Sequence, residues 1–508
     1  MTVLNLISLL GIFVMIGLAW LVSSHRTKVN WRLVIIGVIL QAVFAAVLFQ
    51  SQNWTFSKSF ADFGEVKTAV ESGQLSKARL DAVLAGAKLE SLDAVTKSIE
   101  EGAKTESEIG RAIANDAGQI EIATYKNGIL FAGVDSFFTA IKSYVDEGAN
   151  FVFEGNPSAQ DPLHLLKTFA FGVLPTVVFF ASLMSVLYYL GIMQILIKTM
   201  AWSMEKTLGT SGPESMAAAA NVLVGHTEAP LVVRPYVQNM TRSELNALMV
   251  GGFATISGSL MAIFVVFSGI SAGHLLTASI ISAPAALVIA KILQPETETP
   301  EPTTIQEEPD KVATNVIEAA AIGASDGVQL AINITGMLIA FLALLAMGNA
   351  MLAGFGELIQ YLINLVVANP VDLQWSLDNL FAKLFYPLAW IMGIETGDCA
   401  VAGELLGKKV VVNEFVAYSE MGEILAGRTV DANKNPIVIS HRTEIILTYA
   451  LCGFSNFGAI GIQIGGIGPL APSRRSDLAQ LGLRAMFGGM LAACMTACMA
   501  GMMYGILR

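Results

Sequence analysis

Charged residues are scarce in this chain, and their scarcity excludes most classes of soluble protein. Only 14% of the 508 residues are Asp, Glu, Lys or Arg, whereas 54% are hydrophobic. A typical soluble domain carries about 25% charged residues. The mean hydropathy of +0.61 points the same way. The composition therefore predicts a polytopic membrane protein.

Several chemical signatures are missing as well. The 30 Lys and Arg residues form no basic stripe, which excludes a nucleic-acid footprint. The five histidines are scattered and no HExxH string occurs, so we expect a protein that is not an enzyme. The N-terminus lacks the basic region of a cleavable signal, and its apolar run is long enough to span a membrane. The four cysteines lie in or beside apolar segments, which predicts buried thiols and neither a disulfide framework nor a metal site: Cys399, Cys452, Cys494 and Cys498.

Long uncharged runs are abundant and predict an all-α protein with about eight membrane spans. A run of about 18 or more apolar residues is long enough to cross a bilayer. The run from Leu245 to Ala290 is long enough for two helices, with a polar, glycine-containing turn at Ser268 to His274. The other predicted spans are Leu4 to Ser24, Leu33 to Gln50, Thr168 to Ile197, Leu330 to Phe355, Ile445 to Pro472 and Ala485 to Leu507.

Basic residues near the predicted helix ends set the orientation. Arg26, Lys28 and Arg32 follow the first span, and such an excess marks the cytoplasmic side. Arg474 and Arg475 place the last connection in the cytoplasm by the same rule. We therefore expect a multi-pass protein of the cell (inner) membrane with both termini external.

The predicted order of segments follows from these spans and from two polar stretches. Residues 1–50 hold the first two spans, and 51–128 form a charged external insert that we expect to be helical and without chemistry. Residues 129–293 hold an interfacial helix, the third to fifth spans and a first hairpin. Residues 294–312 form an acidic, proline-rich linker. Residues 313–508 hold a second hairpin and the last three spans.

Each half contains a polar, Gly/Pro-interrupted segment followed by an apolar run that is itself interrupted. In the first half, Ser211 to Tyr236 precedes the interruption Thr255 to Ser259. In the second, Ile391 to Tyr418 precedes the interruption Cys452 to Gly458. A carboxylate at bilayer depth costs at least about 2.5–3.5 kcal/mol and is retained where it faces a cavity, ion or substrate. Corresponding broken segments in two halves predict a transporter site at their interface.

Three strings within these segments are similar to the signatures of the concentrative nucleoside transporters. They are GHTEAPLVVRPY at Gly225 to Tyr236, NEFVAY at Asn413 to Tyr418 and LCGFSNFGAIGI at Leu451 to Ile462. The resemblance covers the first two spans and nearly everything from Asp135 onward, but not the insert. It implies a homotrimer in which each protomer has two re-entrant hairpins and moves nucleoside and cation by an elevator mechanism.

The resemblance also assigns roles to individual residues. Glu414 would hold the ribose, because a carboxylate can accept hydrogen bonds from vicinal hydroxyls. Asn456 would add an amide and Phe454 would pack on the sugar. His226, Thr227 and Glu228 stand where the family has Gln-Thr-Glu facing the base, so His226 is a departure that predicts a different base preference. A second departure is Ala459, where the family commonly has a ribose-contacting serine; Ser455 is a candidate substitute.

A coupling cation completes the expectation. Asn221 and Thr255 match the side-chain ligands of the family's sodium site, and the carbonyl groups of Val224 and Ile256 would complete it. The predicted function is therefore sodium-driven nucleoside import without any other cofactor. The alternatives left open are proton coupling, since His226 and Glu228 titrate, and cation-coupled transport of another polar solute. A channel is disfavoured because occluding hairpins with paired carboxylates do not leave a continuous polar pore.

Overall fold

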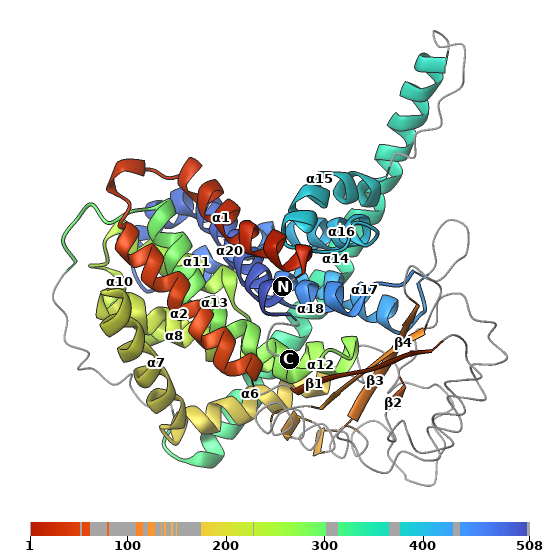
Figure 1. Ribbon diagram of the computed structural model, residues 1–508. Coiled ribbons are helices and arrows are strands. Elements are labelled where there is room, and N and C mark those ends of the chain that lie inside the picture. The colour runs from red at the N-terminus through yellow and green to blue at the C-terminus, as the bar shows by residue number, and fades with distance from the viewer. Residues whose placement is uncertain are drawn as a thin grey trace.

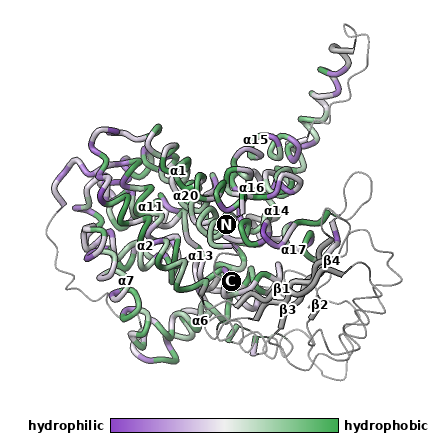
Figure 2. Tube along the Cα trace, viewed as in Figure 1, coloured by the Kyte–Doolittle hydropathy of each residue, from purple (hydrophilic) through white to green (hydrophobic). Residues whose placement is uncertain are grey.

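The computed structural model describes residues 2–50, 174–226, 228–300, 313–364, 376–429 and 437–504, together with four strands between 53 and 126 and single helical residues between 134 and 149. The described elements of 174–504 are helical, as predicted (Figure 1). Apolar residues line most of these helices (Figure 2). The helices are α1 Val3–Leu21, α2 Trp31–Gln50, α6 Leu174–Tyr189, α7 Ile192–Leu208, α8 Gly212–Leu223, α9 Ala229–Val232, α10 Arg234–Val237, α11 Arg242–Ala254, α12 Gly258–Ser268, α13 Ala272–Leu293, α14 Val316–Asn364, α15 Leu377–Ile391, α16 Cys399–Val411, α17 Glu414–Leu425, α18 His441–Leu451, α19 Phe457–Ile467 and α20 Arg475–Met503, with the 3-10 turns η1 Arg26–Lys28 and η4 Pro472–Arg474.

The insert between α2 and α6 contains a four-stranded sheet, so the prediction of a helical insert is wrong for these residues. The strands are β1 Asn53–Phe60, β2 Arg79–Leu80, β3 Glu108–Ala114 and β4 Ile120–Lys126, in the order β1-β4-β3-β2. β4 pairs antiparallel with β1 and β3, and β2 pairs parallel with β3. The physical reason lies in β4, where Ile120, Ile122 and Thr124 alternate with other residues at the period of a strand. The remaining residues of 51–128 lie outside the described part.

Four described helices are long and apolar enough to cross a membrane on their own, namely Val3–Leu21, Trp31–Phe49, Ala272–Leu293 and Pro472–Met503. The predicted span Thr168 to Ile197 is not continuous, because α6 and α7 are bent by 75° at Leu190 and Gly191. Gly191 has φ of +82°, a conformation that glycine adopts without a steric penalty. The turn predicted between α12 and α13 is present at residues 269–271. The count of eight spans stays a prediction, and residues 301–312 of the linker lie outside the described part.

The centre of the helical part is formed by α13 and α20, which are largely buried within the protein. α20 packs against α1, α11, α13 and α18. The outer helices α1, α2 and α14 instead expose apolar side chains, as expected of surfaces that face lipid or another subunit. α14 packs along α6 and then extends away from the other helices (Figure 1). The buried centre therefore positions the interrupted helices described next.

Two helical hairpins lie in the helical part, one in each half. The first hairpin consists of α8 followed by the short helices α9 and α10. The N-terminus of α8 carries a capping box formed by Ser211 and Glu214. Gly225 makes the turn of this hairpin with φ of +88°. The second hairpin consists of α16 and α17, and the side chain of Asn413 caps α17 by accepting from the Val416 amide at 3.0 Å. These hairpins coincide with the polar, interrupted segments of the sequence.

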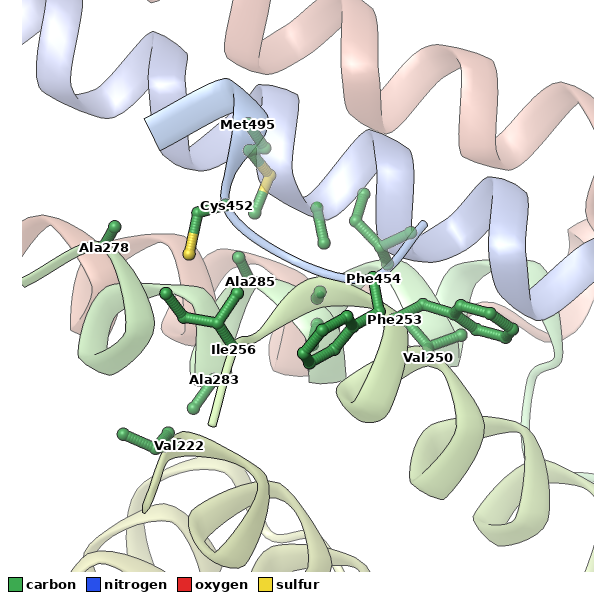
Figure 3. Close-up of a cluster of buried hydrophobic side chains, with 14 of the residues drawn as sticks. Val222, Val250, Phe253, Ile256, Ala278, Ala283, Ala285, Cys452, Phe454 and Met495 are labelled. Carbon is green, nitrogen blue, oxygen red and sulfur yellow. The ribbon is translucent and has the colours of Figure 1, made fainter. Parts of the chain in front are cut away.

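Each hairpin is followed by a broken helix, and the two breaks lie against each other. α11 and α12 are separated by residues 255–257, and α18 and α19 by residues 452–456. Gly453 has φ of +100°, and a methyl group added there would lie 2.6 Å from the carbonyl oxygen of Phe253. Figure 3 shows Cys452 and Phe454 passing over Phe253 and Ile256. The contact between the breaks brings the two halves of the chain together at one point.

This contact predicts a strong effect of Gly453→Ala. The added methyl group would collide with the backbone of α11 and would strain a left-handed residue, so we expect a loss of about 1–3 kcal/mol of stability. Gly461→Ala is the matched control, because Gly461 lies in α19 with nothing within 4 Å of an added methyl group. Thermal unfolding of the detergent-purified variants measures both. Equal melting temperatures would contradict the close crossing of the breaks.

Candidate functional site

The carboxylate of Glu414 and the amide of Asn456 meet at the crossing. Glu414 is the first residue of α17 and is 3% exposed. Nδ2 of Asn456 donates to its Oε2 at 3.0 Å, while Oδ1 of the same amide accepts from the Ala459 backbone N–H at 2.8 Å. Asn456 therefore caps α19 and orients the carboxylate at once. The structure thus brings these two predicted residues together.

The turn of the first hairpin reaches the same place. The rings of His226 and Phe454 lie with their centroids 4.2 Å apart, and both side chains are buried. Nε2 of His226 is buried without a hydrogen-bond partner among the described residues. A buried polar atom in this condition is costly unless a ligand or water pairs with it. His226 therefore offers a free ring nitrogen beside Phe454.

The other two predicted base-contacting residues are placed differently. Thr227 lies outside the described residues. Glu228 precedes α9 and is exposed, in contrast to Glu414. The carboxylate of Asp326 on α14 lies close enough to repel that of Glu228. Sequence reasoning did not single out Asp326, because it stands just before a long uncharged run and has no partner in the motif.

Asn221 and Thr255 are packed together where the first hairpin meets the first break. Both are 1% exposed, and Oγ1 of Thr255 donates to the Asn221 carbonyl oxygen at 3.0 Å. Oδ1 of Asn221 is buried and has no hydrogen-bond donor among the described residues. Val224 ends α8, and Ile256 lies in the break between α11 and α12. An unpaired buried oxygen among main-chain carbonyl groups is a suitable ligand for a hard cation.

Two further buried polar groups border the site. Gln463 of α19 donates to the Met249 carbonyl oxygen at 3.2 Å, and its Oε1 has no partner among the described residues. A methyl group at Gly252 would touch both Gln463 and His226. The only sign of Gln463 in the sequence is a single amide side chain within an apolar segment. The hydroxyl of Ser455 is likewise buried without a hydrogen-bond partner among the described residues. That it substitutes for the missing hydroxyl at Ala459 stays a prediction.

Two features of the described residues concern the signatures of enzyme chemistry. No three His, Cys, Asp or Glu side chains among them gather as a metal site. The spacing GxSxG occurs at Gly269 to Gly273, but these residues form the turn from α12 into α13. A nucleophile elbow needs a turn from a strand into a helix. Two hairpins and two broken helices that meet at one buried polar site are instead the arrangement of a secondary transporter.

Sequence comparisons agree with this class. The chain matches the family descriptions Na+ dependent nucleoside transporter N-terminus over residues 10–63, nucleoside recognition gate over 170–271 and Na+ dependent nucleoside transporter C-terminus over 274–501. An uncharacterized transporter of Haemophilus influenzae is 46% identical over 72% of this chain and 83% of its own length. Solute carrier family 28 member 3 of Eptatretus stoutii is 37% identical over 98% of this chain, which spans 61% of that relative. Sodium/nucleoside cotransporter 1 of Mus musculus is 42% identical over 76% of this chain and 58% of its own length.

Solved structures of a concentrative nucleoside transporter match the whole described architecture. CNTnw in an inward-facing substrate-bound state superposes with a TM-score of 0.74 at 34% identity, covering 99% of this chain and 98% of that one. A variant of CNTnw in an outward-facing state gives 0.73 at 34% identity, with 99% of each chain covered. The chain is therefore a membrane transport protein that belongs to the Na+-dependent nucleoside transporter family, also called the concentrative nucleoside transporters.

The double role of Asn456 predicts a graded response to substitution. Asn456→Ala removes the cap of α19 and the donor to Glu414, so we expect it to lower stability by about 1–3 kcal/mol. Asn456→Ser keeps an oxygen that can cap the helix, so its loss of stability should be roughly half of that caused by Asn456→Ala. Thermal unfolding of both purified variants measures the difference. If serine and alanine melt at the same temperature, the capping role is wrong.

Proposed function

We propose that this chain is a symporter that imports nucleosides, driven by the movement of sodium ions down their gradient. The observation that carries the proposal is the pairing of Glu414 with Asn456 beside His226 and Phe454. A buried carboxylate held by one amide has lone pairs left for the vicinal hydroxyls of a ribose. The aromatic ring of Phe454 supplies an apolar surface for the sugar. The relatives named as nucleoside cotransporters support the same substrate class.

The base would lie toward the first hairpin. His226 offers an unpaired ring nitrogen at this position, and Glu228 and Thr227 are the further candidates. A neutral imidazole has one donor and one acceptor on a rigid ring, so its reach differs from that of the glutamine found in the family. The second hairpin and the broken helix α18/α19 would then hold the sugar. The ligand would bridge the two halves of the chain.

Sodium would bind between the first hairpin and the first break. Its ligands would be the side-chain oxygens of Asn221 and Thr255 and the carbonyl groups of Val224 and Ile256. The unpaired Oδ1 of Asn221 supports this assignment. Binding there would join α8 to the end of α11, so the ion would complete the wall of the nucleoside site.

Assembly and movement follow the family pattern in this proposal. We place both termini outside the cell membrane, with an elevator-like movement of the site across it and three protomers in the assembly. The apolar side chains that α14 leaves exposed support a subunit interface along this helix, among them Ile339, Met347, Met351 and Phe355. A 49-residue helix with such an exposed apolar surface needs lipid or another protomer against that surface.

Proteoliposomes with an inward sodium gradient test the function. Labelled uridine or adenosine should accumulate above the level reached with choline, and nucleosides should compete while free bases should not. Glu414→Gln should reduce uptake by about 10- to 100-fold, because charge-assisted hydrogen bonds contribute roughly 1.5–3 kcal/mol. Glu423→Gln on the same helix is the control, since Glu423 is 48% exposed and pairs with Arg428. Equal competition by uracil and uridine would contradict the ribose site, and uptake driven by a pH gradient alone would replace sodium with protons.

Substitution of His226 tests the base side of the site. His226→Gln restores the residue of the family, and we expect it to change the ratio of uridine to adenosine uptake by several-fold. The sodium concentration at half-maximal uptake should stay the same, since the cation ligands are untouched. A competition panel of nucleosides and deoxynucleosides measures the change. An unchanged ranking of all nucleosides would remove His226 from base recognition.

A further inference from the structure

A lysine is buried at the end of the second broken helix. Lys409 of α16 is 1% exposed, and its Nζ donates to the carbonyl oxygens of Ala450 at 2.8 Å and Cys452 at 3.0 Å. These two carbonyl groups belong to the last turn of α18 and to the first residue of its break. No carboxylate among the described residues lies within ion-pair distance of this ammonium group, and the carboxylate of Glu414 attracts it from further away. Carbonyl groups at a helix C-terminus carry partial negative charge and favour a cation.

The two halves place Lys409 and Asn221 at corresponding positions. Asn221 stands three residues before Val224, which ends the first arm of the first hairpin. Lys409 stands three residues before Val412, which ends the first arm of the second hairpin. Each residue contacts the first residue of the break that follows its hairpin. In the first half the main-chain carbonyl oxygen of Asn221 accepts from Oγ1 of Thr255, and in the second Nζ of Lys409 donates to the carbonyl oxygen of Cys452. The two sites therefore correspond in their place on the hairpin and in the break that they contact.

We propose that the ammonium group of Lys409 is a tethered cation that fills, in the second half, the position taken by sodium in the first. This inference rests on the proposed sodium site at Asn221 and Thr255. Sodium and an ammonium group both bind main-chain carbonyl oxygens. The lysine cannot dissociate, so it stabilises the break of α18 at every stage of transport. Each protomer then has one exchangeable sodium site in this region, although the fold offers two.

The adjacent Lys408 shows that this arrangement is particular to Lys409. Its Nζ lies 3.2 Å from Asp378, 2.6 Å from Glu404 and 2.6 Å from Glu420. Lys408 is therefore a buried cation that is neutralised by carboxylates, whereas Lys409 contacts carbonyl groups. Because Lys408 is also a lysine and lies on the same helix, its substitution provides a matched control.

Sodium-dependent thermal stability tests the proposal. The measurement compares the wild type, Lys409→Asn, Lys409→Arg and Lys408→Asn, purified in detergent, with sodium replaced by choline at constant ionic strength. Each sodium ion that binds only the folded state raises the free energy of unfolding by the same amount for every tenfold rise in sodium concentration. Lys409→Asn recreates the side chain of Asn221, so its melting temperature should rise about twice as steeply with the logarithm of sodium concentration. Lys409→Arg retains the charge and Lys408→Asn leaves the site intact, so both should keep the wild-type slope.

The outcomes separate this proposal from the sodium site on which it rests. A wild-type protein whose melting temperature ignores sodium would overturn the site at Asn221 and, with it, the correspondence. A sodium-dependent wild type with an equal slope for Lys409→Asn would overturn only the role of Lys409. If Lys409→Asn does not fold, Lys409→Gln takes its place with the same expected doubling. A doubled slope in Lys408→Asn would show a general effect of charge removal and would also overturn the proposal.

Discussion

The need to satisfy main-chain polar groups in apolar surroundings governs this structure. A continuous helix satisfies its own carbonyl and amide groups, but a broken one leaves several of them free. α11/α12 and α18/α19 are broken in this way at the centre of the protein, and in each break side chains satisfy some of the free main-chain groups. Ser257 and Asn456 cap the second pieces, while Lys409 holds the end of α18. At the candidate site, buried side-chain atoms such as Oδ1 of Asn221 and Nε2 of His226 have no hydrogen-bond partner among the described residues.

The sequence predicted the helical class, the hairpins and the breaks because each depends on local composition. Gly225, Asn413 and Gly453 stand at turns and caps where their residue types are required, so these elements could be recognised without a structure. The family resemblance assigned Glu414 and Asn456 to the same ribose, but the hydrogen bond between them is seen only in the structure. Their positions relative to His226 did not, because that distance depends on how two halves of the chain pack.

Other features escaped prediction for identifiable physical reasons. The strands of the insert alternate only over seven or eight residues, and the charged sequence around them favoured a helix. The bend at Gly191 interrupts an apolar run in which hydropathy alone shows no boundary. Lys409 and Gln463 looked like isolated polar residues in helices, since their partners lie in other elements. A contact between distant segments has no local signal.

The close approach at Gly453 has a further consequence for how the protein works. Because the two breaks touch through main-chain atoms, no hinge can open between them without separating the walls of the site. In the elevator-like movement that we propose, the hairpins and the breaks would therefore travel as one body. A nucleoside would then meet the same set of contacts from either face of the membrane. The ion gradient, and not a difference in affinity between the two faces, would set the direction of net flux.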